Sequence, residues 1–368
     1  MEKSTHKTCL IDKYVVNLNA PVENTKHNVV GLLNQLGNVQ NKLMVKKDKI
    51  TNFCPDKIWD KYKKSTNEYE HLSCNGANQL NCYAPISRSF FKLWEILNDF
   101  QDEIIKNRRM RVLFLAEGPG GFIEAFVKKR YGYNDTLGAI TLKSVWKSVP
   151  QWKLSKKFMN RVQLIDGVDG TGNLYNIKNI NYMIETFGAN SMDLITGDGG
   201  FDCSIDFNKQ EDMSFRLIFA EITTVVNLQS PGGSCVIKIF DTFSQRMMKL
   251  LQVVTLFYND VYIVKPVTSR PANSEKYIVA TGFKINPENT IYKKLLFTNE
   301  YNEDEIMDVL NNIQFDANVL HWITTYSIYH VEKQINYIQK IFDCIVNKMI
   351  INDNLEASQK WCCSYSLR

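Results

Sequence analysis

Two patterns of apolar residues alternate along the chain and predict its strands and helices. Short continuous apolar runs predict strands, and the segments between several of them have apolar residues at every third or fourth position, as in amphipathic helices. Strands that alternate with helices are typical of a doubly wound α/β fold, with a mostly parallel sheet and ligand sites at the carboxyl ends of the strands. The short runs predict seven strands, at residues 112–116, 137–142, 161–166, 192–198, 233–240, 261–266 and 276–283.

The segments on either side of this pattern differ from it. Residues 1–84 are polar and rich in Lys and Asn, which predicts a helical or irregular extension. A helix is expected from residue 87, with Lys92 beside its apolar face. Residues 286–368 read mainly as helices, so we expect a central domain at 85–285 between two extensions that pack on it.

Composition narrows the class of protein. The 368 residues are 44% hydrophobic and 23% charged, and no apolar run reaches the ~18 residues of a membrane span, so we expect no membrane partner. The amino terminus lacks a secretory pattern, and the nine cysteines and five histidines show no zinc-ligand spacing, which favours reduced thiols inside the cell and no metal. The net charge of +5 suits a polyanionic partner without identifying one.

The first chemical motif is a glycine turn between a strand and a helix. The sequence AEGPGGF spans residues 116–122, where glycines let a ligand approach the backbone and the start of a helix. It is neither the dinucleotide G-x-G-x-x-G pattern nor a phosphate-binding P-loop. A tight strand-to-helix connection without a ligand is the alternative interpretation.

Three charged residues lie within or next to predicted strands. Asp198 follows a predicted central strand, Lys238 lies within a run that should be buried, and Glu275 precedes the last strand. Two of them have a plain structural alternative: a helix cap for Asp198 and a lysine extending to solvent from an edge strand for Lys238. Glu275 is delivered by a turn-rich loop.

With Lys92, these residues resemble the Lys-Asp-Lys-Glu tetrad of FtsJ-like 2′-O-ribose RNA methyltransferases, in the same chain order. The local phrases resemble the cap-specific messenger RNA branch of that family, which has cellular and large DNA virus members. The phrases are DGGF at 198–201, NKQE at 208–211 and KPVTSRPANSEKYIV at 265–279.

The resemblance implies a Rossmann-like methyltransferase fold and S-adenosylmethionine as cofactor. It implies Lys238 as general base, with Lys92, Asp198 and Glu275 orienting and tuning it. Two neighbouring lysines and burial led us to expect a lowered pKa for Lys238. Where many methyltransferases carry an acid after the second strand, this chain reads GAITLK. The implied cofactor-binding residues are Ala116, Glu117, Gly118, Pro119, Gly120, Gly121, Phe122, Asp169, Gly170 and Asp198.

The implied substrate is the first transcribed nucleotides of capped messenger RNA, converted from cap 0 to cap 1. A ribosomal or transfer RNA methyltransferase and a catalytically silent RNA-binding subunit of a capping complex are the alternatives. Other capping or transcription proteins are expected partners. The expected location is the nucleus for a cellular protein, and the cytoplasm, viral factory or virion for a viral protein. The Asn-, Lys- and Ile-rich composition favours a viral source. The expected RNA contacts, with turn chemistry as their alternative, are Asn208, Lys209, Gln210, Ser269, Arg270 and Asn273.

Overall fold

One mostly parallel sheet carries the site. The computed structural model describes residues 15–22, 28–73, 84–146, 149–200, 207–285, 303–351 and 355–367. The strand order is β1-β7-β8-β6-β5-β2-β3-β4, in which β4, β3, β2, β5 and β6 run parallel and β8, β7 and β1 join antiparallel. The strands are β1 Val16–Asn17, β2 Arg111–Leu115, β3 Thr136–Ile140, β4 Val162–Ile165, β5 Met192–Gly197, β6 Gln229–Ile239, β7 Tyr258–Val264 and β8 Lys276–Phe283.

The seven expected strands are therefore present, and the expected number is too low by one. The additional strand, β1, comes from the segment that we expected to be helical or irregular. Two residues are too short for a periodic signal, so the sequence pattern could not reveal this strand. It pairs with the edge strand β7, Val16 against Ile263.

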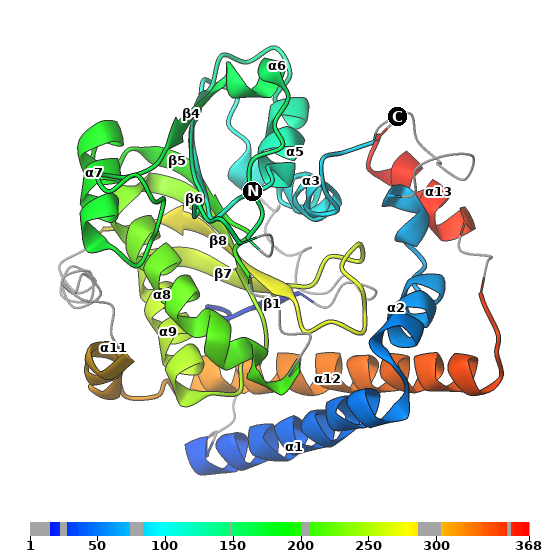
Figure 1. The fold of residues 1–368 in the computed structure, drawn as a ribbon. Helices are drawn as coiled ribbons and strands as arrows, with labels where there is room; N and C mark the ends of the chain where they lie inside the picture. Colours follow the sequence, from blue (N-terminus) through cyan, green and yellow to red (C-terminus); the bar gives the residue numbers. More distant parts are fainter. Residues whose placement is uncertain are drawn as a thin grey trace, which may run out of the picture.

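Helices lie on both faces of the sheet (Figure 1). The helix expected from residue 87 is two helices, because Phe100 leaves the helical conformation and its ring packs 5.2 Å from that of Tyr262. The helical elements are α1 Val29–Phe53, α2 Asp56–Ser65, η1 Glu70–Ser73, α3 Ser89–Asp99, α4 Gln101–Ile104, α5 Gly121–Lys129, α6 Lys156–Met159, α7 Ile177–Phe187, η2 Phe207–Lys209, α8 Gln210–Leu228, α9 Gln245–Phe257, α11 Glu303–Asn311, α12 Ala317–Val346 and α13 Leu355–Ser364.

The strands alternate between two apolar clusters. On β2, Leu113 and Leu115 pack with α7, α8 and α9, whereas Val112 and Phe114 pack with α3 and α5. This is the period-two pattern of a strand buried on both faces. A third cluster joins α1, α2 and α12, and Figure 1 shows α1 and α12 side by side as two long helices.

No helix in the described ranges is both long and apolar enough to cross a bilayer. The same ranges hold no group of three or more His, Cys, Asp or Glu side chains that could bind a metal ion.

Candidate active site

Lys238 and Asp198 meet at the carboxyl ends of two adjacent parallel strands. The Lys238 Nζ donates to the backbone oxygen of Asp198 at 2.6 Å and lies 3.2 Å from its Oδ1. β6 alternates so that Ile237 and Ile239 face α8 and α9, which turns Lys238 toward the α3 and α5 face. A Cβ on Gly200 would lie 3.1 Å from the Lys238 Nζ, so glycine at this position leaves the space beside the amine open.

Tyr277 completes this side of the cluster. The register of β6 and β8 places it directly opposite Lys238, and directly opposed residues share a face of the sheet. Its hydroxyl donates to Asp198 Oδ1 at 2.9 Å. Sequence reasoning missed Tyr277, although its place two residues after Glu275 in a strand was a usable signal.

Lys92 and Glu275 form the second pair. Lys92 lies on α3, and its Nζ donates to Glu275 Oε2 at 2.7 Å. Both side chains are largely buried, at 14% and 12% exposed. The other Glu275 oxygen, Oε1, is buried and accepts no hydrogen bond. Two ammonium groups and two carboxylates thus come together from segments far apart in the chain, and their formal charges cancel.

Charge attraction opposes burial in this cluster. Burial alone would lower the pKa of Lys238, but Asp198 and then Glu275 outweigh it, and the pKa is raised. Our expectation of a lowered pKa is therefore wrong for the chain without ligands, because the carboxylates act more strongly on this amine than burial does. Burial would raise the pKa of Glu275, but Lys92 and Lys238 lower it to about 2.

The glycine turn lies after β2, where the expected cofactor cradle should be. A Cβ on Gly118 would lie 2.2 Å from the Pro150 carbonyl oxygen, and one on Gly121 would lie 2.2 Å from Ser89 Oγ, so neither position has room for a side chain. Gly120 has a φ of 115°, which favours glycine. Close packing and the positive φ therefore require glycine in this turn, which leads directly into α5.

Glu117 is buried in this turn with an unused oxygen. Glu117 is only 2% exposed, and its Oε1 accepts no hydrogen bond. Burial and then the charge of Asp198 raise its pKa well above the usual value. A buried acceptor without a donor is costly unless a ligand completes it.

Comparison with known proteins now identifies the family. The FtsJ-like methyltransferase family matches residues 85–283, more than half of the chain. The chain belongs to the FtsJ-like methyltransferase family. This range contains the glycine turn and both amine–carboxylate pairs.

Individual relatives extend the family assignment. A cap-specific mRNA (nucleoside-2′-O-)-methyltransferase 1 of Trypanosoma cruzi is 33% identical over 178 residues, 46% of this chain and 47% of the relative. The protein of that name from Bos taurus is 26% identical over 281 residues, covering 70% of this chain and 33% of the relative. The chain thus spans about half or less of the length of these curated relatives.

A solved structure with a similar fold is that of a ribosomal RNA methyltransferase, putative, from Plasmodium falciparum. The similarity covers 54% of this chain and 97% of that chain, with a TM-score of 0.41 and 21% identity.

Two of the expected cofactor-binding residues, Asp169 and Gly170, belong to a self-contained loop. The Asp169 carboxylate accepts hydrogen bonds from Thr171 N at 3.0 Å, Asn176 Nδ2 at 2.7 Å and Asn179 Nδ2 at 3.0 Å. The hydrogen bonds from Thr171 are the main cause of its lowered pKa. Gly170 follows with a φ of 71°. In the FtsJ-like chain without ligands, Asp169 shapes its own loop.

The atypical GAITLK sequence is also resolved. Thr141 Oγ1 accepts the Gly118 backbone N–H at 3.1 Å, so this threonine supports the glycine turn. Lys143 pairs with Asp166 at 2.6 Å, with both side chains substantially exposed. Asp166 follows β4, and its carboxylate pairs with Lys143, which follows β3.

The expected RNA contacts fall into two groups. Arg270 forms a two-pronged pair with Glu70 at 2.7 and 3.1 Å, Asn208 donates to Asp48 at 2.6 Å, and Ser269 is buried. The remaining three, Lys209, Gln210 and Asn273, are exposed or half-buried. Phe201, the last residue of the DGGF phrase, lies outside the described residues.

Glu221 is a second residue that sequence reasoning missed. It is a buried acid on α8, and a Cβ on Gly197 would lie 2.8 Å from its carboxyl group. Burial raises its pKa to about 8, although Lys238 opposes the shift. An acid inside the apolar run RLIFAEITTVV was the signal that could have found it.

Proposed function

We propose that this chain uses S-adenosylmethionine to methylate the ribose 2′-hydroxyl of the first transcribed nucleotides of capped messenger RNA, converting cap 0 to cap 1. The observation that carries the proposal is the placement of two amine–carboxylate pairs at the strand ends beside the glycine turn. The names of the relatives support the choice of substrate, which remains a proposal because the chain spans half or less of their length.

The residues at the turn fit the cofactor. The unused oxygen of Glu117 offers an acceptor, and it lies in the turn that leads into the start of α5. Residues 116–122, with Asp169, Gly170 and Asp198, are therefore our proposed cofactor contacts. When bound, S-adenosylmethionine supplies an activated methyl group on a sulfonium, whose positive charge also lowers the pKa of a neighbouring ammonium.

The amine–carboxylate cluster performs the proton chemistry. A ribose hydroxyl is a weak nucleophile at neutral pH, so a positioned base must take its proton while the oxygen bonds to the methyl carbon. Lys238 Nζ, in its neutral form, is our proposed base. Asp198 accepts hydrogen bonds from both Lys238 and Tyr277 and so holds Lys238 in place, and the Glu275–Lys92 pair fixes the charge beside it.

The raised pKa of Lys238 adds a condition to this mechanism. The ammonium form dominates in the chain without ligands, so Lys238 must lose a proton before it acts. The positive charge of a bound S-adenosylmethionine would favour that loss. Lys238 would release this proton to solvent, and its neutral amine could then accept the proton of the ribose hydroxyl.

RNA contacts follow from exposure and charge. Lys209, Gln210 and Asn273 are exposed or half-buried and are our first candidates on that ground. Arg270 and Asn208 would have to exchange an acidic partner for RNA, and Ser269 would have to leave a buried position.

The proposal also covers the organisation and the location of the chain. We place the catalytic domain at 85–285, with extensions at 1–84 and 286–368. We propose that the protein acts in an intracellular compartment together with the capping or transcription machinery.

Mass analysis of a short RNA after reaction tests the proposal. Capped and uncapped forms of one sequence are incubated with the protein and S-adenosylmethionine, then digested to nucleosides. We expect a 2′-O-methyl group on a cap-proximal nucleotide of the capped form only. Equal methylation of both forms would favour a ribosomal or transfer RNA substrate, and binding of RNA without transfer would favour the silent subunit.

A further inference from the structure

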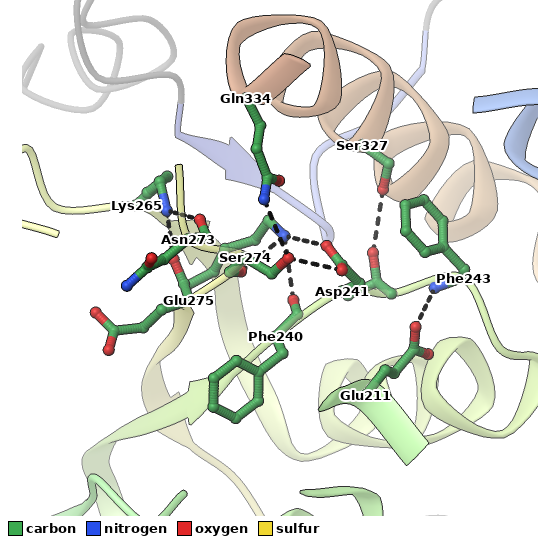
Figure 2. A network of polar contacts seen from close by, with 12 residues as sticks. Glu211, Phe240, Asp241, Phe243, Lys265, Asn273, Ser274, Glu275, Ser327 and Gln334 are labelled. Atoms are coloured by element: carbon green, nitrogen blue, oxygen red, sulfur yellow. Dashed lines mark hydrogen bonds and ion pairs between the residues drawn. The ribbon is translucent and has the colours of Figure 1, made fainter. Parts of the chain in front are cut away.

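A buried polar network connects the loop that carries Glu275 to two helices outside the matched family region. Figure 2 shows this network around Asp241, Ser274 and Gln334. Lys47 comes from α1 and Gln334 from α12, while the FtsJ-like match covers residues 85–283 only. The loop that carries Glu275 is thus held in part by two helices that lie outside the matched family region.

Asp241 is the centre of the network. It lies three residues after Lys238, where the chain leaves β6. Its Oδ2 pairs with Lys47 Nζ at 2.9 Å, and its Oδ1 lies 3.2 Å from Lys276 Nζ. All three residues are at most 6% exposed, so water screens these charges little. One carboxylate therefore joins α1 to the residue that follows Glu275.

Ser274, the residue before Glu275, is held from both helices. Its Oγ donates to Asp241 Oδ2 at 2.7 Å and accepts from Lys47 Nζ at 2.9 Å. Gln334 Nε2 donates to the Ala272 backbone oxygen at 2.9 Å and approaches Ser274 Oγ at 3.4 Å. The two neighbours of Glu275 in the chain are therefore fixed, and its own side chain points away from the network (Figure 2). Its Oε2 accepts the hydrogen bond from Lys92.

The two helices form a firm support for these contacts. α1 and α12 pack against each other through a separate apolar cluster that includes Leu43, Ile50, Ile338 and Phe342. Thr242, next to Asp241, shares a hydrogen bond of 3.1 Å with Ser327 of α12. A charge or amide on such a support can fix a loop to within the small tolerance that catalysis requires.

We propose that Lys47 and Gln334 are positioning residues, through which α1 and α12 fix Glu275 beside Lys92 and Lys238 for the methyl transfer. This inference rests on the proposed function. The flanking helices thereby contribute to the turnover step itself, without touching cofactor or substrate. A network that serves folding alone would affect stability and leave turnover by folded protein unchanged.

The test measures kcat and KM for methyl transfer to capped RNA in the full chain, together with binding of S-adenosylmethionine by calorimetry and the melting temperature. Lys47→Met removes the charge beside Asp241 and keeps an unbranched side chain. We expect kcat to fall ~10- to 100-fold, because small displacements of positioned groups cost rate. Cofactor affinity should stay within about twofold, since the glycine turn is untouched.

Three further variants make the result decisive. Lys47→Arg keeps the charge and should recover most of the lost kcat. Lys49→Met, on the exposed side of α1, should behave as wild type. Gln334→Met removes only neutral hydrogen bonds, so it tests the same loop if Lys47→Met does not fold, and it should lower kcat with cofactor affinity kept.

The outcomes separate the two proposals. If the wild-type chain methylates capped RNA and both Lys47→Met and Gln334→Met keep the wild-type kcat at lower melting temperature, the positioning role is wrong and the proposed function stands. Equal loss of kcat in Lys47→Arg and Lys47→Met would also overturn it. If the wild-type chain transfers no methyl group to any RNA, the proposed function itself fails.

Discussion

The glycine turn after β2 and the loop before β8 both carry proposed functional residues, but different parts of the chain hold them. The turn is enclosed by Ser89, Thr141, Pro150 and their neighbours, all within a few dozen residues of it. The loop is held by hydrogen bonds with Glu95, Glu70 and Lys47, which are separated from their partners in the loop by 172, 200 and 227 positions in the sequence. A local phrase can therefore specify the turn, whereas the loop depends on the packing of the whole chain.

The two regions should also fail in different ways. Damage to the turn should weaken cofactor binding first, because its backbone forms the cradle. The loop before β8 carries Glu275 of the amine–carboxylate cluster. Damage to this cluster should slow methyl transfer first, because its groups act on the proton of the ribose hydroxyl. Variants of Lys238, Glu275 and Gly118 test this division.

The largest effect is expected from Lys238→Met. Loss of a positioned base should lower kcat by about 10²- to 10⁴-fold, with little change in cofactor affinity. In the wild type, kcat/KM should rise with pH through the neutral range, since the raised pKa of Lys238 keeps the amine protonated in the free enzyme. Steady-state kinetics and calorimetry check both points; a flat profile, or loss of cofactor binding, would mean that Lys238 is misplaced.

Acid should weaken the Glu275 side of the cluster. The pKa of this carboxyl falls from 4.5 to about 2 on folding, so its stabilising contribution is complete above pH 4.5 and is lost as pH falls toward 2. The shift corresponds to about 3 kcal/mol. Denaturant unfolding of wild type and Glu275→Gln should show a difference in free energy that shrinks over this range. A difference that stays constant with pH would contradict the pairing with Lys92.

Gly118→Ala should affect the turn and leave the cluster intact. Its Cβ would lie 2.2 Å from the Pro150 carbonyl oxygen, so the backbone must shift, at a cost of about 1–3 kcal/mol. We expect weaker cofactor binding by calorimetry and a lower melting temperature. Gly37→Ala is the matched control, since nothing lies within 4 Å of that position and alanine favours the helix. Unchanged cofactor affinity in Gly118→Ala would count against the cradle.

The smallest effect concerns RNA and salt. Lys209→Ala should lower the slope of log affinity against log salt by ~0.7, the value for one phosphate contact on single-stranded RNA. Arg270→Ala should leave the slope unchanged, because this guanidinium is paired with Glu70. Fluorescence anisotropy at several salt concentrations measures both slopes. A lower slope for Arg270→Ala would show that RNA displaces Glu70.

The sequence predicted what periodicity and local phrases can encode. The alternation of Val112, Leu113, Phe114 and Leu115 gave a doubly buried strand, and the glycines after it gave the turn. The convergence of Lys92 with Glu275 was expected only through resemblance to a family. The partners of Asp241 could not be predicted, because Lys47 and Lys276 meet it only after α1 packs against the rest of the chain.

The electrostatic balance was the least accessible part. Burial and a second lysine argued for a lowered pKa of Lys238, but the sequence gives no distances, and the sign depends on how near Asp198 and Glu275 lie. Tyr277 and Glu221 each carried a signal in the sequence, but their distances from the site follow from the strand register and the packing of α8.

The short strand β1 has a consequence for solubility. An open sheet ends in backbone groups that can recruit a strand from another molecule. Here Val16 and Asn17 occupy part of the free border of β7, and the Asn19 amide binds the backbone oxygens of Thr255 and Tyr258 beside it. Shortening the chain to begin at Asn28 would uncover that border, so such a fragment should self-associate, which size-exclusion chromatography would show as a larger species.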